Sequence, residues 1–211
     1  MAKIRDKGKR MSNHLIRNII INLSLLVISG SFQGCSLSDE QVLRKEFNIP
    51  QSANLTVLNS VPKTSGSFGR EGLKIDATFK FSPSDFNSYR EQVRENKQWK
   101  SLPLSRDFLI KITGVSRIVE SLQRVYELQE KPVPEPGSIY NPTEEQLLEE
   151  WMSKLPVDVK NGFYRCLTAG DNLMYANKVS CSEKQGDLND FMLAILDIDQ
   201  HTLRVKVHTA Y

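Results

Sequence analysis

The 211-residue sequence is poor in the residues that carry most enzyme chemistry. It has three cysteines and three histidines, and only His201 and His208 lie beyond residue 34. It lacks the motifs Gly-x-Ser-x-Gly, Gly-x-x-x-x-Gly-Lys-Ser/Thr, His-Glu-x-x-His and Gly-x-Gly-x-x-Gly. The sequence therefore shows no signature of a serine hydrolase, a P-loop enzyme, a zinc protease or a dinucleotide-binding protein. We expect no cofactor, no metal and no catalytic residue that the sequence alone can name.

An excess of charge of one sign is also missing from most of the chain. Residues 1–34 hold six basic residues against one acidic residue, whereas residues 35–211 hold 22 basic and 24 acidic residues. The formal net charge of +3 therefore comes from the N-terminal segment, and the rest carries −2. A nucleic-acid-binding surface needs dense positive charge to displace counterions from phosphate, so we expect no nucleic-acid partner.

Long apolar runs are limited to the N-terminal segment, which has the three parts of a secretory signal. A basic stretch ends at Arg17, an apolar run covers 19–28, and the small residues Ser29, Gly30 and Ser31 follow. As a helix, ten residues span roughly 15 Å, about half of the hydrocarbon core of a bilayer. The run is therefore read as a cleaved export signal, with an uncleaved N-terminal anchor as the alternative.

The end of this run carries the sequence Phe32-Gln33-Gly34-Cys35-Ser36. It resembles the lipobox of bacterial lipoproteins, in which a cysteine after a small residue is lipidated and becomes the mature N-terminus. Gly34 and Cys35 fit the pattern, whereas Phe32 and Gln33 replace the leucine and the small residue that the family prefers. The resemblance implies palmitate or a similar acyl chain on Cys35. It also implies a location in the cell envelope, on the periplasmic side of the outer membrane if the host is diderm.

The number of cysteines supports the same interpretation. An exported chain with three thiols leaves one unpaired after a single disulfide forms, and lipidation of Cys35 removes the odd thiol. Ordinary cleavage near Ser31 is the other alternative. Cys166 and Cys181 are then predicted to form a disulfide, because no Cys-x-x-Cys or His-x-x-x-His pattern provides metal ligands. Free buried thiols are the alternative for this pair.

The chain is predicted to contain three regions. Residues 1–34 form the signal peptide, residues 35–52 a lipid-anchored tether with a short helix, and residues 53–211 a single domain. Four prolines within 131–142 prevent a helix or a sheet ladder there and predict a surface connection. This connection could separate two subdomains, but domains of about 75 residues fold alone only marginally, so one domain is favoured.

The secondary structure follows from apolar periodicity and capping residues. Before residue 100 the predicted elements are a helix over 39–47, a strand over 54–60, a loop over 65–72, a strand over 73–81 and a helix that begins at Ser82. After residue 100 they are a strand over 108–112, a helix over 118–129, a helix that begins within 141–144, and strands over 163–167, 191–196 and 203–208. The predicted fold class is α+β, with a mostly antiparallel sheet and two or three amphipathic helices on one of its faces.

The remaining polar clusters have structural interpretations. His201 lies in a polar turn, and His208 is expected on the solvent-facing side of the last strand. Asp197-x-Asp199 lacks the glycine and glutamate that a calcium loop requires, so a hairpin turn is expected. Four glutamates between residues 144 and 150 fall on the polar side of a helix, where solvated charge is the ordinary outcome.

These observations leave two classes of function. The first is a lipid-anchored envelope protein that acts as a binding or structural module for a protein, peptide or glycan, including an immunity or inhibitor protein. The alternative is an envelope hydrolase with an unrecognised site that uses His208, Asp197 and a loop serine. The sequence identifies neither the partner nor the oligomeric state.

Overall fold

The computed structural model describes residues 37–63, 72–169, 173–188 and 190–209. The chain divides into two compact units, Met1–Ser38 and Asp39–Tyr211. Nearly all described residues belong to the second unit. The predicted signal peptide and lipobox lie outside the described residues, as does nearly all of the predicted loop at 65–72.

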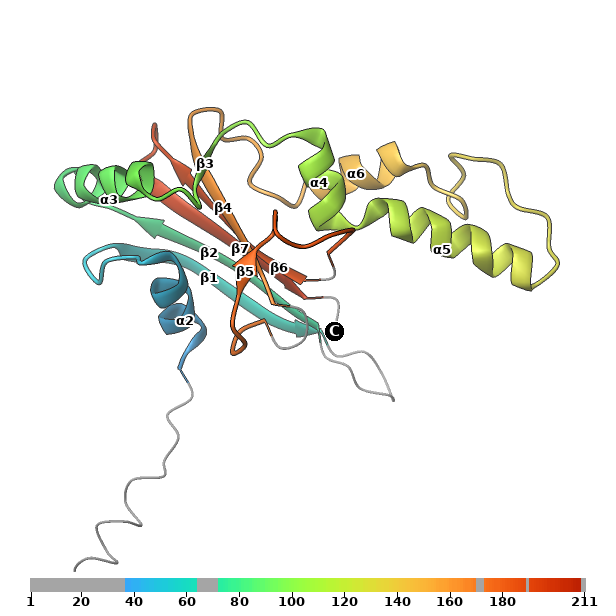
Figure 1. Ribbon diagram of the computed structural model, residues 1–211, viewed down its shortest axis with the longest axis horizontal. Coiled ribbons are helices and arrows are strands. Elements are labelled where there is room, and N and C mark those ends of the chain that lie inside the picture. Colours follow the sequence, from blue (N-terminus) through green and yellow to red (C-terminus); the bar gives the residue numbers. More distant parts are fainter. Residues whose placement is uncertain (1–36, 64–71, 170–172, 189, 210–211) are drawn as a thin grey trace, which may run out of the picture. The chain divides into compact units, whose positions relative to one another are not determined.

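One antiparallel sheet organises the second unit (Figure 1). Its strand order is β1-β2-β7-β6-β4-β3, and the short strand β5 also pairs with β4. The strands are β1 (Asn54–Lys63), β2 (Gly72–Lys80), β3 (Lys100–Ser101), β4 (Gly162–Thr168), β5 (Val179–Ser180), β6 (Asp190–Asp197) and β7 (Thr202–Thr209). The longest predicted strands are confirmed, and the pairing of β2 with β7 joins the two halves of the sequence in one sheet.

The described helices are α2 (Asp39–Phe47), α3 (Pro83–Glu95), α4 (Arg106–Thr113), α5 (Val115–Leu128) and α6 (Glu144–Met152). Helices α2, α3 and α6 begin where the sequence indicates, whereas α5 begins three residues before its predicted start and α4 is not among the predicted helices. Ser82 accepts a hydrogen bond from the Asp85 amide, and Thr143 forms a reciprocal capping box with Gln146. In the part of the chain that the structure describes, no helix is long and apolar enough to cross a membrane.

The core has two parts, one on each face of the sheet. On the first face, Met192, Ala194 and Leu196 of β6 pack with buried residues of α2 and α3. On the second face, alternate residues of β6 pack with buried residues of α4 and α6. The expectation that the helices share one face is therefore wrong. Every residue of β6 is buried because helices cover both of its sides.

The predicted strand at 108–112 is also wrong, because these residues lie in α4. Ser105 caps the helix by accepting from the Phe108 amide, and Gly114 ends it with φ of 64°. Apolar residues at 108, 110 and 112 alternate as in a strand, but Leu109 and Ile112 are the two apolar side chains that α4 buries. Their spacing of three residues fits a helix, and the caps at Ser105 and Gly114 favour a helix over a strand for this segment.

Helix α2, which the sequence assigns to the tether, belongs to the compact unit. Val42, Leu43 and Phe47 are buried in the core of the first face. The Tyr89 hydroxyl donates to the Phe47 carbonyl at 2.7 Å, and the Arg165 guanidinium donates to the Glu46 carbonyl at 2.8 Å. The folded unit therefore begins at Asp39, four residues after Cys35.

The predicted disulfide between Cys166 and Cys181 is present. It joins β4 to the residue after β5, with the two Cα atoms 5.4 Å apart. The Cys181 amide also donates to the Cys166 carbonyl at 3.0 Å. The bond holds the end of the segment that connects β4 to β5 against the sheet.

Candidate functional site

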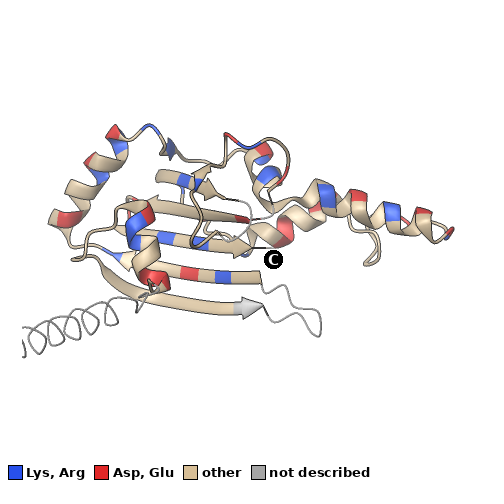
Figure 2. Cartoon of the chain, turned by 60° about the horizontal axis from the view of Figure 1, so that its bottom comes forward, with Lys and Arg blue, Asp and Glu red and all other residues tan. Residues whose placement is uncertain are grey.

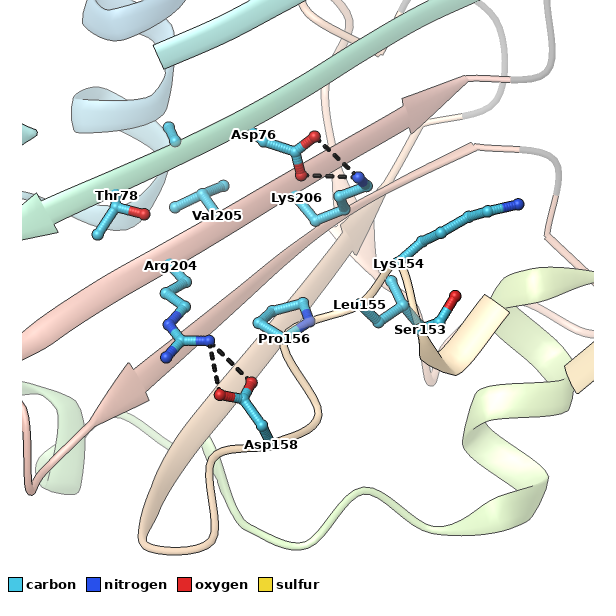
Figure 3. Close-up of a pocket in the computed structure, with 11 residues that line it drawn as sticks. Asp76, Thr78, Ser153, Lys154, Leu155, Pro156, Asp158, Arg204, Val205 and Lys206 are labelled. Carbon is cyan, nitrogen blue, oxygen red and sulfur yellow. Dashed lines mark hydrogen bonds and ion pairs between the residues drawn. The ribbon is translucent and has the colours of Figure 1, made fainter. Parts of the chain in front are cut away.

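A polar pocket of about 320 Å³ lies on the second face of the sheet (Figure 3). We call it the trough. Strands β2 and β7 form its floor, and the segment 153–158 that follows α6 forms its wall. Its lining residues are Asp76, Ala77, Thr78, Ser153, Lys154, Leu155, Pro156, Asp158, Arg204, Val205 and Lys206. The trough exists because β2 and β7, 130 residues apart, pair directly beneath the chain that leaves α6.

An ion pair occupies the floor of the trough. Asp76 and Lys206 are direct partners in the register of β2 and β7. The Lys206 Nζ donates to both carboxylate oxygens of Asp76, at 2.7 and 2.9 Å. The Lys206 side chain is only 10% exposed, whereas that of Asp76 is 51% exposed. The lysine side chain is thus largely covered, whereas its carboxylate partner is half exposed on the open side.

A second ion pair connects the floor to the wall. Arg204 Nη1 donates to both oxygens of the Asp158 carboxylate, at 2.8 and 3.1 Å. The Asp158 side chain is 68% exposed. Leu155 is buried between the wall and the core of the second face. The wall is therefore held by apolar contacts of Leu155 and Val157 and by one solvent-accessible ion pair.

The other polar groups of the wall bond to α6. The Ser153 hydroxyl donates to the Glu150 carbonyl at 2.7 Å. Lys154 pairs with the Glu150 carboxylate, and this hydrogen bond lowers the pKa of Glu150 below its ordinary value. In Figure 3 the Lys154 side chain extends away from Lys206. The trough therefore contains one wall cation that is directed outward and two floor cations that are paired.

This arrangement suits binding better than catalysis. Nucleophilic catalysis needs a hydroxyl or thiol beside a general base, but the Ser153 hydroxyl donates to backbone and no histidine lines the trough. In the ranges that the structure describes, no group of three His, Cys, Asp or Glu residues is placed to hold a metal. The trough instead offers both donors and acceptors to a polar ligand.

The residues of the alternative hydrolase site lie apart. In the β6–β7 hairpin, Asp197 pairs with Thr202 at one end and His208 with Phe191 near the other. His208 is six positions after Thr202 along the extended strand, which corresponds to roughly 20 Å. The Asp197 carboxylate accepts from the Asp199 and Gln200 amides and so shapes the turn. These residues cannot act on one substrate atom.

His208 is buried, which corrects the expectation that it faces solvent. It is 9% exposed and lies 4.8 Å from the Trp151 ring and 5.7 Å from the Phe191 ring, measured between centroids. Trp151 reaches it from α6, which covers this end of β7. His201 lies in the predicted turn, with φ of 53°, and stacks on Phe86 at 4.3 Å.

Three of the four glutamates of α6 are exposed to solvent, as expected, and some of the four also form ion pairs. Glu144 and Glu145 pair with Arg106, and the Ser116 hydroxyl donates to Glu144 at 2.6 Å. The hydrogen bond to Glu145 raises the pKa of Arg106 above its ordinary value. These contacts join α4, α5 and α6 to one another. Figure 2 shows that basic and acidic residues are interspersed over the helices and strands rather than gathered by sign.

A second exposed feature is the arm, which we define as residues 115–140. In Figure 1, α5 extends away from the sheet and the following loop returns to α6. Leu128, Ile139 and Tyr140 are 78%, 86% and 66% exposed. Only Val115 of α5 is buried, although the helix has a regular apolar stripe. The Tyr126 hydroxyl donates to the Tyr140 carbonyl at 3.3 Å and joins helix to loop.

The chain matches no family model, no curated protein and no solved structure in the comparisons made with each. Sequence reasoning did not identify the trough, because its residues come from three distant segments. The available signal was the charged residues on the outward side of otherwise apolar strands, at positions 76, 204 and 206.

Proposed function

We propose that this protein is a bacterial envelope lipoprotein that binds a polar partner in the trough. Cys35 is the acylated residue and holds the folded unit at the membrane. The unit itself serves as a binding module without a reaction of its own. The sequence from Arg17 to Cys35 and the bond between Cys166 and Cys181 support export, because disulfides persist mainly in oxidising compartments.

The observation that carries the binding function is the pairing of charge in the trough. Asp76 and Asp158 each accept two hydrogen bonds from a cation beneath or beside them, and both carboxylates remain at least half exposed. A ligand can add hydrogen bonds to these groups without burying an unpaired charge, which would be costly. Such preorganised, partnered groups give orientation and specificity to a bound polar chain.

A protein or peptide segment fits the trough better than a glycan. None of the eleven lining residues is aromatic, so the apolar face of a sugar ring finds no ring to pack on. Pro156 of the wall offers a small apolar surface beside the charged floor. A segment with both a charged and an aliphatic side chain matches this combination.

Photocrosslinking in the intact envelope tests this function. The photoreactive residue p-benzoylphenylalanine replaces Thr78, on the floor, or Glu91, which is half exposed on α3, as the matched control. We expect a discrete adduct from position 78 that weakens when Arg204→Ser removes one floor cation. An adduct of equal yield from position 91, or none from position 78, would contradict binding in the trough.

A further inference from the structure

Strand β1 forms an edge of the sheet with few of the features that usually protect such an edge. Within the described residues it has one strand neighbour, β2. Its residues from Asn54 to Val61 carry no charge, and Val57, Leu58 and Val61 are 41%, 40% and 58% exposed. Soluble proteins usually place charges, prolines or bulges on exposed edges. Here a bulge lies at the start of β1, and Pro62 and Lys63 lie at its end, so the middle of the strand is unprotected.

Helix α2 places the start of the folded unit beside this edge. The Ser60 hydroxyl donates to the Asp39 carboxylate at 2.7 Å. Arg44 fixes the other end of the helix by donating to the carbonyls of Pro50 and Ala53, at 2.7 and 2.9 Å. Figure 1 shows α2 next to β1, on the side of the sheet where β1 is the outermost strand. The point at which the chain enters the folded unit is therefore fixed at the β1 edge.

The length of chain before Asp39 limits how far this edge can lie from an anchor. Asp39 is four positions after Cys35, so their Cα atoms are at most about 14 Å apart even in a fully extended chain. We propose that the β1 edge lies on the membrane surface, with Val57, Leu58 and Val61 in contact with lipid. This inference rests on the proposed acylation of Cys35, which brings a lipid surface within that distance.

The aliphatic side chains of the β1 edge can contact a lipid surface that the short tether already keeps nearby. Three partly exposed aliphatic side chains are too few to bind a bilayer from solution. A short tether raises the local concentration to the millimolar range, at which weak contacts are populated. Asp39 lies beside the edge, and the described stretch Asn54–Val61 contains no basic residue, so the contact is apolar and does not require anionic lipid. Aliphatic side chains at headgroup depth are typical of interfacial contacts.

The proposed contact also fixes the position of the trough. Strand β7 is separated from β1 by β2 alone, and neighbouring strands lie about 4.8 Å apart, so the trough is roughly 10 Å from the β1 edge. With β1 on the membrane, the sheet stands upright and the trough opens sideways, close above the headgroups. Its ligand is then a segment that lies close to the membrane surface.

Lipid quenching of a fluorophore tests this contact in the native, full mature protein. The protein is extracted from its envelope with detergent, reconstituted into phosphatidylcholine vesicles, and labelled with an environment-sensitive probe at Val61→Cys or Leu58→Cys. Ile139→Cys is the matched control, because Ile139 is more exposed but lies on the arm. We expect a blue shift at both β1 positions and stronger quenching by brominated lipid than at position 139.

Two other outcomes would contradict the proposed membrane contact of β1. Quenching at position 58 or 61 that is no greater than at position 139 shows that β1 does not contact lipid. Protection of these positions only in native envelopes, and not in vesicles, shows that a protein strand covers the edge instead. Mass analysis of the N-terminal peptide separates the two proposals. Acylated Cys35 without β1 quenching refutes only the membrane contact, whereas unmodified Cys35 refutes the anchor as well.

Discussion

Lys206 and Asp76 face each other across β7 and β2, and they form an ion pair in which the lysine side chain is far more buried than the aspartate side chain. Removal of either partner should therefore have unequal effects. Asp76→Ala leaves a desolvated cation without its acceptor and should lower the free energy of unfolding by about 2 kcal/mol. Lys206→Met retains the packing of the stem and leaves a half-exposed carboxylate, so it should cost less than about 1 kcal/mol.

Urea unfolding of the two single variants and the double variant measures this difference. We expect the double variant to be more stable than Asp76→Ala alone, because it no longer contains an unpaired buried ammonium. Equal destabilisation by the two single changes would show that the burial of Lys206 does not determine the energy of this pair.

Tyr89 should make the protein sensitive to alkali. Burial raises the pKa of the Tyr89 hydroxyl far above its ordinary value of 10.0, and nearby Arg165 only partly opposes this. The unfolded chain loses this proton near pH 10 while the folded state retains it. The stabilising contribution is therefore complete below pH 10 and declines as the pH rises further.

The variant Tyr89→Phe isolates that contribution. It leaves the buried Phe47 carbonyl without its donor and should lower the free energy of unfolding by about 1–2 kcal/mol at pH 7. It should also lose less stability than the wild type between pH 9 and pH 11, measured by denaturant unfolding at each pH. Parallel curves for the two proteins would contradict a protonated, buried Tyr89.

The disulfide should stabilise the segment between Leu167 and Phe191 more than the rest of the sheet. A loop of 15 residues closed by a disulfide contributes roughly 3 kcal/mol in the chain-entropy model. The double variant Cys166→Ser with Cys181→Ser should show a lower melting temperature and faster proteolysis within this segment. Two free thiols in denatured, unreduced protein from the native compartment would contradict both the bond and export.

Substitutions at two glycines distinguish the cost of a steric clash from the cost of a strained backbone conformation. A Cβ at Gly162 would lie 1.9 Å from the Leu196 carbonyl oxygen of the neighbouring strand, so Gly162→Ala should cost about 3 kcal/mol. Gly186 has φ of 69° and nothing within 4 Å of its Cβ position, so Gly186→Ala should cost only about 1 kcal/mol of backbone strain. Thermal unfolding compares them, and a larger effect at Gly186 would contradict the close approach of β4 to β6.

Local patterns predicted most elements of the fold because their signals lie within a few residues. The alternation in β2 and the caps at Ser82 and Thr143 are examples. The segment 108–112 was misassigned because a short apolar alternation fits both a strand and one face of a helix. The continuous apolar run of β6 did indicate burial on both faces, and it could have shown that helices cover both sides of the sheet.

The candidate site could not be predicted in the same way, because it depends on long-range pairing. Asp76, Asp158 and Arg204 meet only after β2 pairs with β7 and the chain beyond α6 folds back. The burial of His208 likewise depends on Trp151, which is 57 residues away in the sequence. The disulfide was predictable because only two cysteines remain beyond Cys35.

Fatty-acid labelling of the wild type and of Cys35→Ala in the native host tests the proposed function most directly. The lipid anchor predicts labelled wild-type protein that partitions into detergent and whose mature N-terminal peptide begins with acylated Cys35. The Cys35→Ala variant should lose both the label and the partitioning, while its folded unit, which begins at Asp39, keeps its melting temperature. Unchanged labelling in Cys35→Ala, or a mature peptide that begins before Cys35 with a free thiol, would contradict the anchor.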